Sequence, residues 1–288
     1  MSKLIWMAVA IALTAAAAPA AAAEHDGRLG KIKESGEIVI GHRQDARPFS
    51  FVEGDGAPAG YTIDLCTRIV EGIKSDLGLS NLNIRYVPVT AENRFEKIAD
   101  GSIDLECGNS SMTLTRMAEV DFTNMIFITG ASMLLRIDEQ ITGLKDLAGK
   151  SVAVVEGTTT QQELQDKLKA ESVDAKVVPV KDHGDGLKAL LDNKVHAYAG
   201  DQIVLIGLAR TAPDPSKLAL VRELFSYEPY AIALPRNDAD LRMSANRVLA
   251  RLYRSGEITA VYDKWFGDWG GRPTPLLVAM FALNGIPE

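Results

Sequence analysis

The first half of the chain alternates short apolar runs with helical repeats of apolar residues. Runs in which apolar residues are contiguous or alternate over a few positions are typical of strands, whereas spacings of three and four, as at Leu65, Ile69 and Ile73, are typical of a helix. The predicted strands cover 37–42, 82–89 and 103–107, and the predicted helices cover 64–77 and 90–100. Strands that alternate with helices indicate βαβ units, and therefore an α/β fold with a mainly parallel sheet.

The second half repeats this alternation, which predicts two lobes of similar plan. Its predicted strands cover 150–155, 173–180 and 194–199, its predicted helices cover 160–170 and 186–192, and closing helices follow at 241–253 and 256–266. Two further apolar segments, 125–135 and 230–234, lie between the two blocks. We predict that these segments are paired crossing strands that form a hinge.

Residues 1–23 differ from the rest of the chain and are typical of a secretory signal peptide. Lys3 precedes an Ala-rich apolar run from Leu4 to Ala18, and small residues lead to Glu24, where charged residues begin. The alternative is a membrane anchor, but the run is short for a bilayer span and ends in small residues. Cleavage would leave 288 − 23 = 265 residues with a charge of 30 − 38 = −8. The expected mature protein is exported and soluble.

Composition excludes several other classes of protein. With 47% hydrophobic and 24% charged residues, the chain is neither disordered nor collagenous. Its net charge of −7 argues against nucleic-acid binding, which needs a basic face. Cys66 and Cys107 are either a disulfide of an exported protein or two buried thiols. The four histidines have no metal-ligand spacing, so no metal site and no cofactor are expected.

Polar residues cluster just after four of the predicted strands. The carboxyl ends of strands in an open α/β sheet border the ligand crevice, so these segments should face one cleft. The segments are 42–43, 108–111, 157–160 and 200–201. Together they carry one arginine, several hydroxyls, glycines and one aspartate.

Two of the candidate elements are suited to an anion. Thr160 and Glu163 have the spacing of a capping box, which predicts a helix start whose free N–H groups, with the hydroxyls of Thr158 and Thr159, can bind an anion. The alternative is an ordinary capped helix. Arg116, after the loop of Ser111, can form two parallel hydrogen bonds to a carboxylate, or instead pair with Glu119 on the surface.

Four more side chains complete the candidate site. Arg43 lies at a strand exit, and Arg94 lies in the first half of a predicted helix, where a cation opposes the helix dipole and so suggests an anionic partner. His183, in a polar turn before a helix, can donate to an anion and make affinity depend on pH. Asp201 is a candidate counter-ion for an ammonium group, or else a helix cap. For each of the others the alternative is a solvated side chain.

Together, the candidate residues would give the cleft three arginines, one histidine, one helix start and one carboxylate. A ligand that matches it has two carboxylates and one ammonium group, which describes an acidic amino acid. A ligand with a neutral side chain would leave one or two buried cations unpaired, at a cost of several kcal/mol.

The chain resembles the periplasmic solute-binding proteins of polar amino-acid ABC importers, most closely the glutamate/aspartate-binding branch. The similar stretches follow one another through nearly the whole mature chain, and only the ordered set is specific. They are 41–51 (GHRQDARPFSF), 60–65 (GYTIDL), 93–94 (NR), 104–111 (DLECGNSS), 115–123 (TRMAEVDFT), 156–159 (EGTT), 181–185 (KDHGD) and 263–266 (DKWF).

This resemblance implies a type II-like periplasmic-binding-protein fold, whose two lobes, joined by two crossing strands, clamp the ligand. Lobe 1 would comprise 24–132 and 230–288, and lobe 2 would comprise 133–229. The implied ligand contacts are Arg116, Thr158, Thr159 and Ser111 for the α-carboxylate, Asp201 for the α-ammonium group, and Arg43, Arg94 and His183 for the side-chain carboxylate. Asn109 stands where the branch often has serine, which affects a backbone contact and the preferred ligand size.

The resemblance also implies partners and rivals. The expected ligand is L-glutamate or L-aspartate, the expected location is the periplasm, and the expected state is a monomer. The permease and its ATPase would be separate chains, because no Gly-x-x-x-x-Gly-Lys-[Ser/Thr] loop is present. The first rival is an exported cyclic-acid dehydratase on the same fold, with Glu106 or Glu156 as acid or base. The second is a sensor module, which would usually be fused to a membrane segment.

Overall fold

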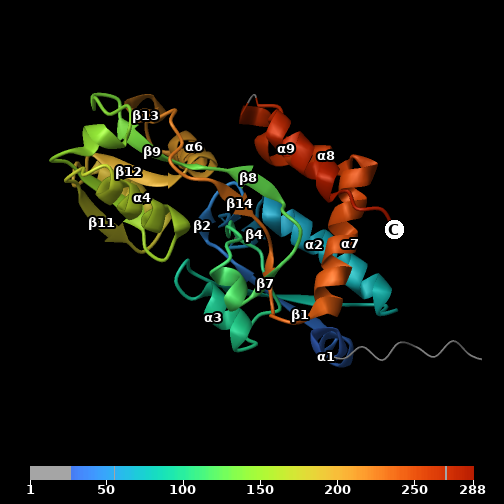
Figure 1. The fold of residues 1–288 in the computed structure, drawn as a ribbon. Coiled ribbons are helices and arrows are strands. Elements are labelled where there is room, and N and C mark those ends of the chain that lie inside the picture. The colour runs from blue at the N-terminus through green and yellow to red at the C-terminus, as the bar shows by residue number, and fades with distance from the viewer. Residues whose placement is uncertain (1–26, 55, 270) are drawn as a thin grey trace, which may run out of the picture.

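The chain folds into two α/β lobes connected by a pair of short strands (Figure 1). The computed structural model describes residues 27–54, 56–269 and 271–288. The predicted signal peptide, 1–23, lies outside the described residues. Within them, no helix combines the length and the apolar character that crossing a membrane requires. The predicted two-lobed α/β fold is confirmed.

The first lobe contains a five-stranded sheet with the strand order β5-β1-β6-β15-β7. Its strands are β1 (Glu37–His42), β5 (Asn83–Pro88), β6 (Leu105–Glu106), β7 (Asp121–Phe122) and β15 (Ala233–Leu234). The strands β5, β1 and β6 pair in parallel, and β15 pairs antiparallel with β6 and β7. The sheet therefore has a parallel centre that is completed by β15, which follows the second lobe along the chain.

The second lobe repeats this arrangement with the order β11-β10-β12-β9-β13. Its strands are β9 (Ala131–Arg136), β10 (Ser151–Val155), β11 (Lys176–Val180), β12 (Ala197–Asp201) and β13 (Leu218–Leu220). Here β11, β10 and β12 pair in parallel, and β9 pairs antiparallel with β12 and β13. Both lobes thus direct the carboxyl ends of their parallel strands toward the space between them.

Helices and one small sheet complete the lobes. The first lobe has α1 (Gly27–Ser35), α2 (Tyr61–Asp76), α3 (Arg94–Ala99), the 3₁₀ turn η1 (Arg116–Ala118), α7 (Ala239–Ser255), α8 (Glu257–Phe266), η4 (Gly267–Trp269) and α9 (Pro275–Asn284). The second lobe has η2 (Leu144–Leu147), α4 (Thr159–Ala170), α5 (His183–Leu191), α6 (Gln202–Thr211) and η3 (Pro215–Lys217). A three-stranded sheet, not predicted from the sequence, is formed by β2 (Asp45–Ala46), β3 (Ser50–Val52) and β4 (Pro58–Ala59).

The start of one helix differs from the prediction for a local reason. The predicted helix over 90–100 begins only at Arg94. The Thr90 amide donates to Asn93 Oδ1 at 2.9 Å, and the Asn93 amide donates to Thr90 Oγ1 at 3.2 Å. These side chains hold a separate turn, and such local bonds compete with helix formation.

The hinge is a two-stranded antiparallel sheet of β8 (Phe127–Thr129) and β14 (Glu228–Tyr230). The sequence placed the crossing strands at 125–135 and 230–234, so the second was predicted too late. The first apolar segment is divided at Gly130, where a Cβ atom would collide with the carbonyl oxygen of Ser226. The pairing of β8 with β14 ends at Thr129, and β9, which begins at Ala131, pairs with β12 of the second lobe.

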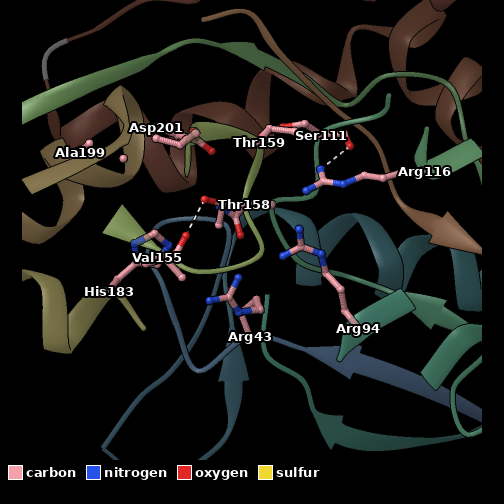
Figure 2. Close-up of a pocket in the computed structure, with 13 residues that line it drawn as sticks. Arg43, Arg94, Ser111, Arg116, Val155, Thr158, Thr159, His183, Ala199 and Asp201 are labelled. Carbon is pink, nitrogen blue, oxygen red and sulfur yellow. Dashed lines mark hydrogen bonds between the residues drawn. The ribbon is translucent and has the colours of Figure 1, made fainter. Parts of the chain in front are cut away.

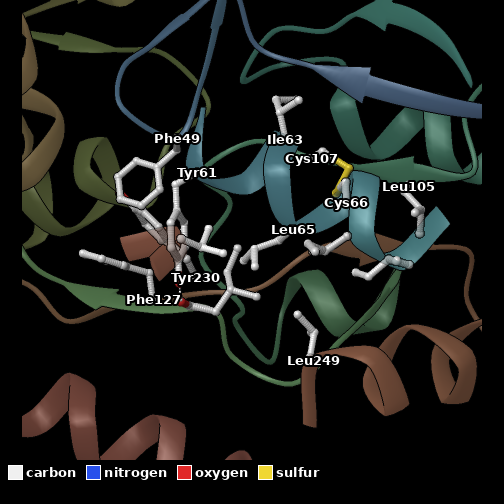
Figure 3. Close-up of a cluster of buried hydrophobic side chains, with 14 of the residues drawn as sticks. Phe49, Tyr61, Ile63, Leu65, Cys66, Leu105, Cys107, Phe127, Tyr230 and Leu249 are labelled. Carbon is white, nitrogen blue, oxygen red and sulfur yellow. Dashed lines mark hydrogen bonds between the residues drawn. A yellow bond between two sulfur atoms is a disulfide. The ribbon is translucent and has the colours of Figure 1, made fainter. Parts of the chain in front are cut away.

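Aromatic side chains fill the core beside the hinge (Figure 3). Phe49 is fully buried, and its ring centroid lies 4.9 Å from that of Phe127 and 5.0 Å from that of Tyr230. The rings of Phe127 and Phe266 stack at 5.2 Å. Edge and stacked aromatic contacts add to the free energy gained by burial. The hinge strands are thus anchored to the core of the first lobe.

The structure joins Cys66 and Cys107 in a disulfide (Figure 3). Cys66 lies in α2, Cys107 directly follows β6, and both are fully buried. The bridge ties α2 to the strand whose exit loop carries Asn109 and Ser111.

We expect the double variant Cys66→Ala, Cys107→Ala to lose about 2–4 kcal/mol of unfolding free energy, because the disulfide restricts the conformations that the unfolded chain can adopt. The closed loop spans 41 residues. Urea denaturation measures the loss. Reduction should destabilise the native protein but leave the double variant unchanged, and equal stability of the variant and the oxidised native protein would contradict the prediction.

Candidate functional site

One pocket between the lobes is lined by all nine ligand-binding candidates (Figure 2). The first lobe supplies Arg43 after β1, Arg94 at the start of α3, Asn109 and Ser111 after β6, and Arg116 at η1. The second lobe supplies Thr158 and Thr159 at the start of α4, His183 at the start of α5, and Asp201 at the end of β12. Val155, Thr160, Ala199 and Gly200 also line it. The strand-exit argument therefore identified one continuous pocket.

Three guanidinium groups converge on this pocket (Figure 2). Arg43 and Arg94 are only 2% and 3% exposed. Arg94 Nε has no hydrogen-bond partner among the described residues. Burial and the charge of neighbouring Arg116 lower the pKa of Arg94 to about 9, so it is still a cation at neutral pH. A buried cation without a full set of acceptors favours an anionic partner.

Arg116 faces the pocket rather than pairing on the surface. Its Nη1 donates to the Ser111 carbonyl at 2.8 Å, and its Nη2 reaches the Gly157 carbonyl of the other lobe at 3.5 Å. Its guanidinium carbon lies 5.1 Å from the ring centroid of Phe95, which also contacts Arg94 at 4.8 Å. No ion pair of Arg116 occurs within the part of the chain that the structure describes, so the surface pair with Glu119 is not formed.

The start of α4 is capped by a different threonine from the one predicted. The helix begins at Thr159, and the N-cap residue Thr158 accepts from the Gln161 amide at 3.1 Å. Thr160 is the second residue of the helix, two positions after the cap, so the predicted box of Thr160 and Glu163 is wrong. Its hydroxyl instead donates to Asp201 Oδ1 at 2.7 Å. The first amides of α4 still have no acceptor inside the helix, so they can bind an anion.

His183 opens α5 instead of preceding it, because Asp182 caps the helix by accepting from the Asp185 amide at 2.8 Å. Burial lowers the pKa of His183 to about 4, so the ring is neutral at physiological pH. A neutral ring can still donate one hydrogen bond to an anion. His183 Nδ1 lies 2.6 Å from the Tyr198 hydroxyl. Burial raises the pKa of Tyr198, so its hydroxyl stays protonated at neutral pH. In the tautomer in which this hydroxyl donates to Nδ1, the His183 ring has Nε2–H as a donor.

Asp201 is the carboxylate of the pocket wall. It accepts from the hydroxyls of Thr160 and Tyr230. It stands at the N-cap position of α6 but makes no capping bond with its side chain, so the alternative of a purely structural cap is not supported. Burial, followed by the charge of Glu228, raises the pKa of Asp201 to about 6.

Sequence reasoning missed Glu228, which connects the hinge to both lobes. This residue of β14 is 1% exposed and accepts from Ser111 Oγ in one lobe and from Thr159 Oγ1, at 2.6 Å, in the other. Its second oxygen accepts from Ser226 Oγ at 2.7 Å. The predicted crossing strand began at 230, two residues too late to include Glu228. A hinge carboxylate thus orients two of the predicted ligand-binding hydroxyls.

Two more carboxylates lie behind the arginines. Asp45 forms an ion pair with Arg43 at 3.1 Å. Glu106 is fully buried, and neither of its carboxylate oxygens has a partner among the described residues. The sequence inventory counted Asp201 alone, so it overstated the excess of positive charge. The pocket lining is still richer in cations, because Asp45, Glu106 and Glu228 do not line it.

Neither a metal cluster nor the two predicted acid–base residues occur in the pocket, as far as the described residues go. Over the described ranges, no group of three or more His, Cys, Asp or Glu residues is placed to hold a metal ion. Neither Glu106 nor Glu156, the candidates for acid–base chemistry, lines the pocket.

Comparison with known families assigns the chain to one of them. Residues 38–268 match the bacterial extracellular solute-binding proteins, family 3. The chain belongs to this family. The L-glutamate/L-aspartate-binding protein of Pseudomonas aeruginosa is 33% identical to this solute-binding protein over 261 residues, which cover 90% of this chain and 86% of the relative. The glutamate/aspartate import solute-binding protein of Escherichia coli is 30% identical, with 93% and 88% covered.

Solved structures share the fold. The P235GK mutant of ArgBP from T. maritima has a TM-score of 0.74 at 26% identity, covering 83% of this solute-binding protein and 99% of that chain. The ancestral amino-acid-binding protein AncCDT-1, a precursor of cyclohexadienyl dehydratase, has a TM-score of 0.74 at 24% identity, with 83% and 100% covered. At that identity the second likeness concerns the fold alone.

We expect Glu228→Gln to lower the pKa of Asp201 below about 6, because the variant removes a neighbouring negative charge but keeps an acceptor oxygen. The pKa should stay above the ordinary value of 3.8, since burial is its main cause. A carbon-13 NMR titration of the Asp201 carboxyl measures the change. The control is Glu223→Gln, which removes an exposed charge from the segment between β13 and β14. An unchanged Asp201 titration in Glu228→Gln would show that the two carboxylates do not interact.

Proposed function

We propose that this solute-binding protein captures L-glutamate and L-aspartate between its lobes and delivers them to the membrane permease of an ABC importer. The observation that carries the proposal is the convergence of Arg43, Arg94 and Arg116 on a pocket whose opposite wall holds a helix start and Asp201. The names and similarity of the P. aeruginosa and E. coli relatives support the same ligand class.

In the proposed binding mode, one set of groups binds the α-carboxylate and the α-ammonium group, which all amino acids share. The α-carboxylate is held by Arg116, by Ser111 and by the start of α4 at Thr158 and Thr159, since a guanidinium and free helix amides both donate to it. Asp201 accepts the α-ammonium group. These groups come from both lobes, so full contact needs the closed arrangement.

A second set of groups binds the side chain of the ligand. Arg43, Arg94 and the neutral His183 hold the side-chain carboxylate, with His183 donating through Nε2. Arg94 is suited to this because its Nε lacks an acceptor among the described residues. Asn109 also lines the pocket and limits the length of the ligand, and its buried Oδ1 has no partner in the described structure. A neutral ligand side chain would leave these cations without an anion.

Closure follows from the hinge. We propose that the second lobe lies between β8 and β14 along the chain, that the first lobe comprises the segments before β8 and after β14, and that the two rotate about these strands to enclose the ligand. The closed monomer would present both lobes to a permease served by a separate ATPase chain. After removal of the signal peptide it would act in the periplasm, as a carrier and not as an enzyme.

Calorimetry on protein stripped of bound ligand tests the function. We expect L-glutamate or L-aspartate to bind with a Kd in the micromolar range or tighter, which corresponds to about −8 kcal/mol or better. Arginine is the control, because its cationic side chain would face Arg43 and Arg94. Tight binding of glutamine with no binding of glutamate would overturn the proposed ligand class. Catalytic loss of a cyclic acid at sub-stoichiometric protein would overturn the carrier role.

Affinity for L-glutamate should fall as the pH drops below about 6, because Asp201 then gains a proton and loses the charge that holds the ammonium group. The groups that act on Asp201 are Glu228, Arg116, and the hydroxyls of Tyr230 and Thr160. As the pH falls from about 6 to 5, we expect Kd to rise by up to about tenfold. Glutamate keeps its own charges over most of this range, and His183, whose pKa is about 4, stays neutral.

Calorimetry from pH 5 to 7.5 measures this dependence. The matched variant Asp201→Asn should bind weakly at every pH in the range and show no such slope. A wild-type Kd that is flat over the range would show that protonation of Asp201 does not oppose binding.

A further inference from the structure

One carboxylate outside the pocket lining ties the lobes together beside it. Asp45 lies in β2 of the first lobe, two residues after Arg43. Its Oδ1 accepts from Arg43 Nη2 at 3.1 Å, and its Oδ2 accepts from the backbone amide of His183 at 2.6 Å. His183 opens α5 of the second lobe. Asp45 therefore bridges a proposed ligand-binding arginine of one lobe and a helix start of the other.

The charge of Asp45 is held in this place. Burial alone would raise the pKa of Asp45, but His183, Arg43 and the bond from the His183 amide outweigh it and lower the pKa. The Arg43 side chain is 3% exposed and the Asp45 side chain 21% exposed, so solvent screens the pair only in part. The first amides of α5 also favour a negative charge at this point. At neutral pH the ion pair therefore cancels one of the three cations that face the pocket.

We propose that Asp45 is a positioning residue that limits how strongly the site prefers an acidic side chain over its amide, and that it also links the lobes through α5. The inference rests on the proposed function, because it concerns the ligand side chain that Arg43 would contact. A ligand carboxylate that approaches Arg43 also approaches the anion behind it. A ligand amide carries no net charge and is not repelled in this way.

The two roles of Asp45 use different chemistry, so they can be separated by substitution. Selectivity depends on its negative charge, which acts on the ligand through a partly desolvated region. The link to α5 depends only on an acceptor oxygen near the His183 amide. Asparagine keeps an acceptor oxygen and removes the charge, whereas alanine removes both.

The test compares binding of L-glutamate and L-glutamine by calorimetry at pH 7.5. In Asp45→Asn, the ratio of the glutamine Kd to the glutamate Kd should rise about tenfold over wild type, the size of effect that one charge has at this range in a partly screened site. Asp45→Ala should bind both ligands more weakly. X-ray scattering of the ligand-free protein should also give a larger radius of gyration for Asp45→Ala than for Asp45→Asn.

The control is Asp185→Asn, which removes an exposed charge from the first turn of the same helix without touching Arg43. It should leave the ratio within about twofold of wild type. If Asp45→Asn does not fold, Asp45→Ser, which is also neutral and has an acceptor oxygen, repeats the measurement.

The outcomes distinguish this inference from the proposed function. A Kd ratio in Asp45→Asn that equals that of wild type, or falls, overturns the role in selectivity. A radius of gyration in Asp45→Ala that equals that of wild type overturns the link between the lobes. If wild-type protein binds neither acidic amino acid nor amide, the proposed function fails, and the scattering comparison still decides whether Asp45 links the lobes.

Discussion

The constraint on which the site depends is the burial of guanidinium groups. Arg43 and Arg94 are almost fully removed from solvent, and this burial, followed by repulsion from Arg116, lowers the pKa of Arg94 to about 9. Such groups are stable only where anions or acceptors lie close. The chain supplies part of this compensation from Asp45 and Glu106, which lie behind the pocket wall. These two carboxylates offset part of the positive charge and so stabilise the buried arginines. The faces of the guanidinium groups that line the pocket still favour an anionic ligand.

The hinge takes part in the site as well as in the movement of the lobes. Glu228 and Tyr230 are two residues apart in β14, so their side chains lie on the same face of the strand. Glu228 accepts from Ser111 and Thr159, and Tyr230 donates to Asp201. The ring of Tyr230 also packs on Phe49 in the core of the first lobe (Figure 3). A rotation about β14 must therefore change contacts in the site, which gives the fold a direct physical connection between binding and closure.

The sequence was sufficient for the parallel centres of both sheets and, together with the family resemblance, for nine of the thirteen residues that line the pocket. Parallel strands present their carboxyl ends on one edge, which is why four of the strand exits meet there. Other features depend on long-range contacts that no local pattern encodes. The strands β2 and β4 have two residues each, too few for a periodic signal. Glu228 is reached only through the pairing of β14 with β8. Thr158 and not Thr160 caps α4, and the hydroxyl of Thr160 instead contacts Asp201, which is 41 positions away in the sequence.

The arrangement of the pocket separates what all amino acids share from what distinguishes them. In the proposed binding mode, the start of α4, Arg116 and Asp201 hold the α-carboxylate and the ammonium group, whatever the side chain is. Discrimination then rests on Arg43, Arg94 and His183 and on the carboxylates that accompany them. The backbone positions of these residues follow from the strand exits, but the net charge that the ligand side chain meets depends on individual side chains such as Asp45. A change of ligand preference therefore needs no change of fold, because one charged side chain beside Arg43 alters the field at the far end of the pocket while the contacts to the α-carbon groups stay as they are.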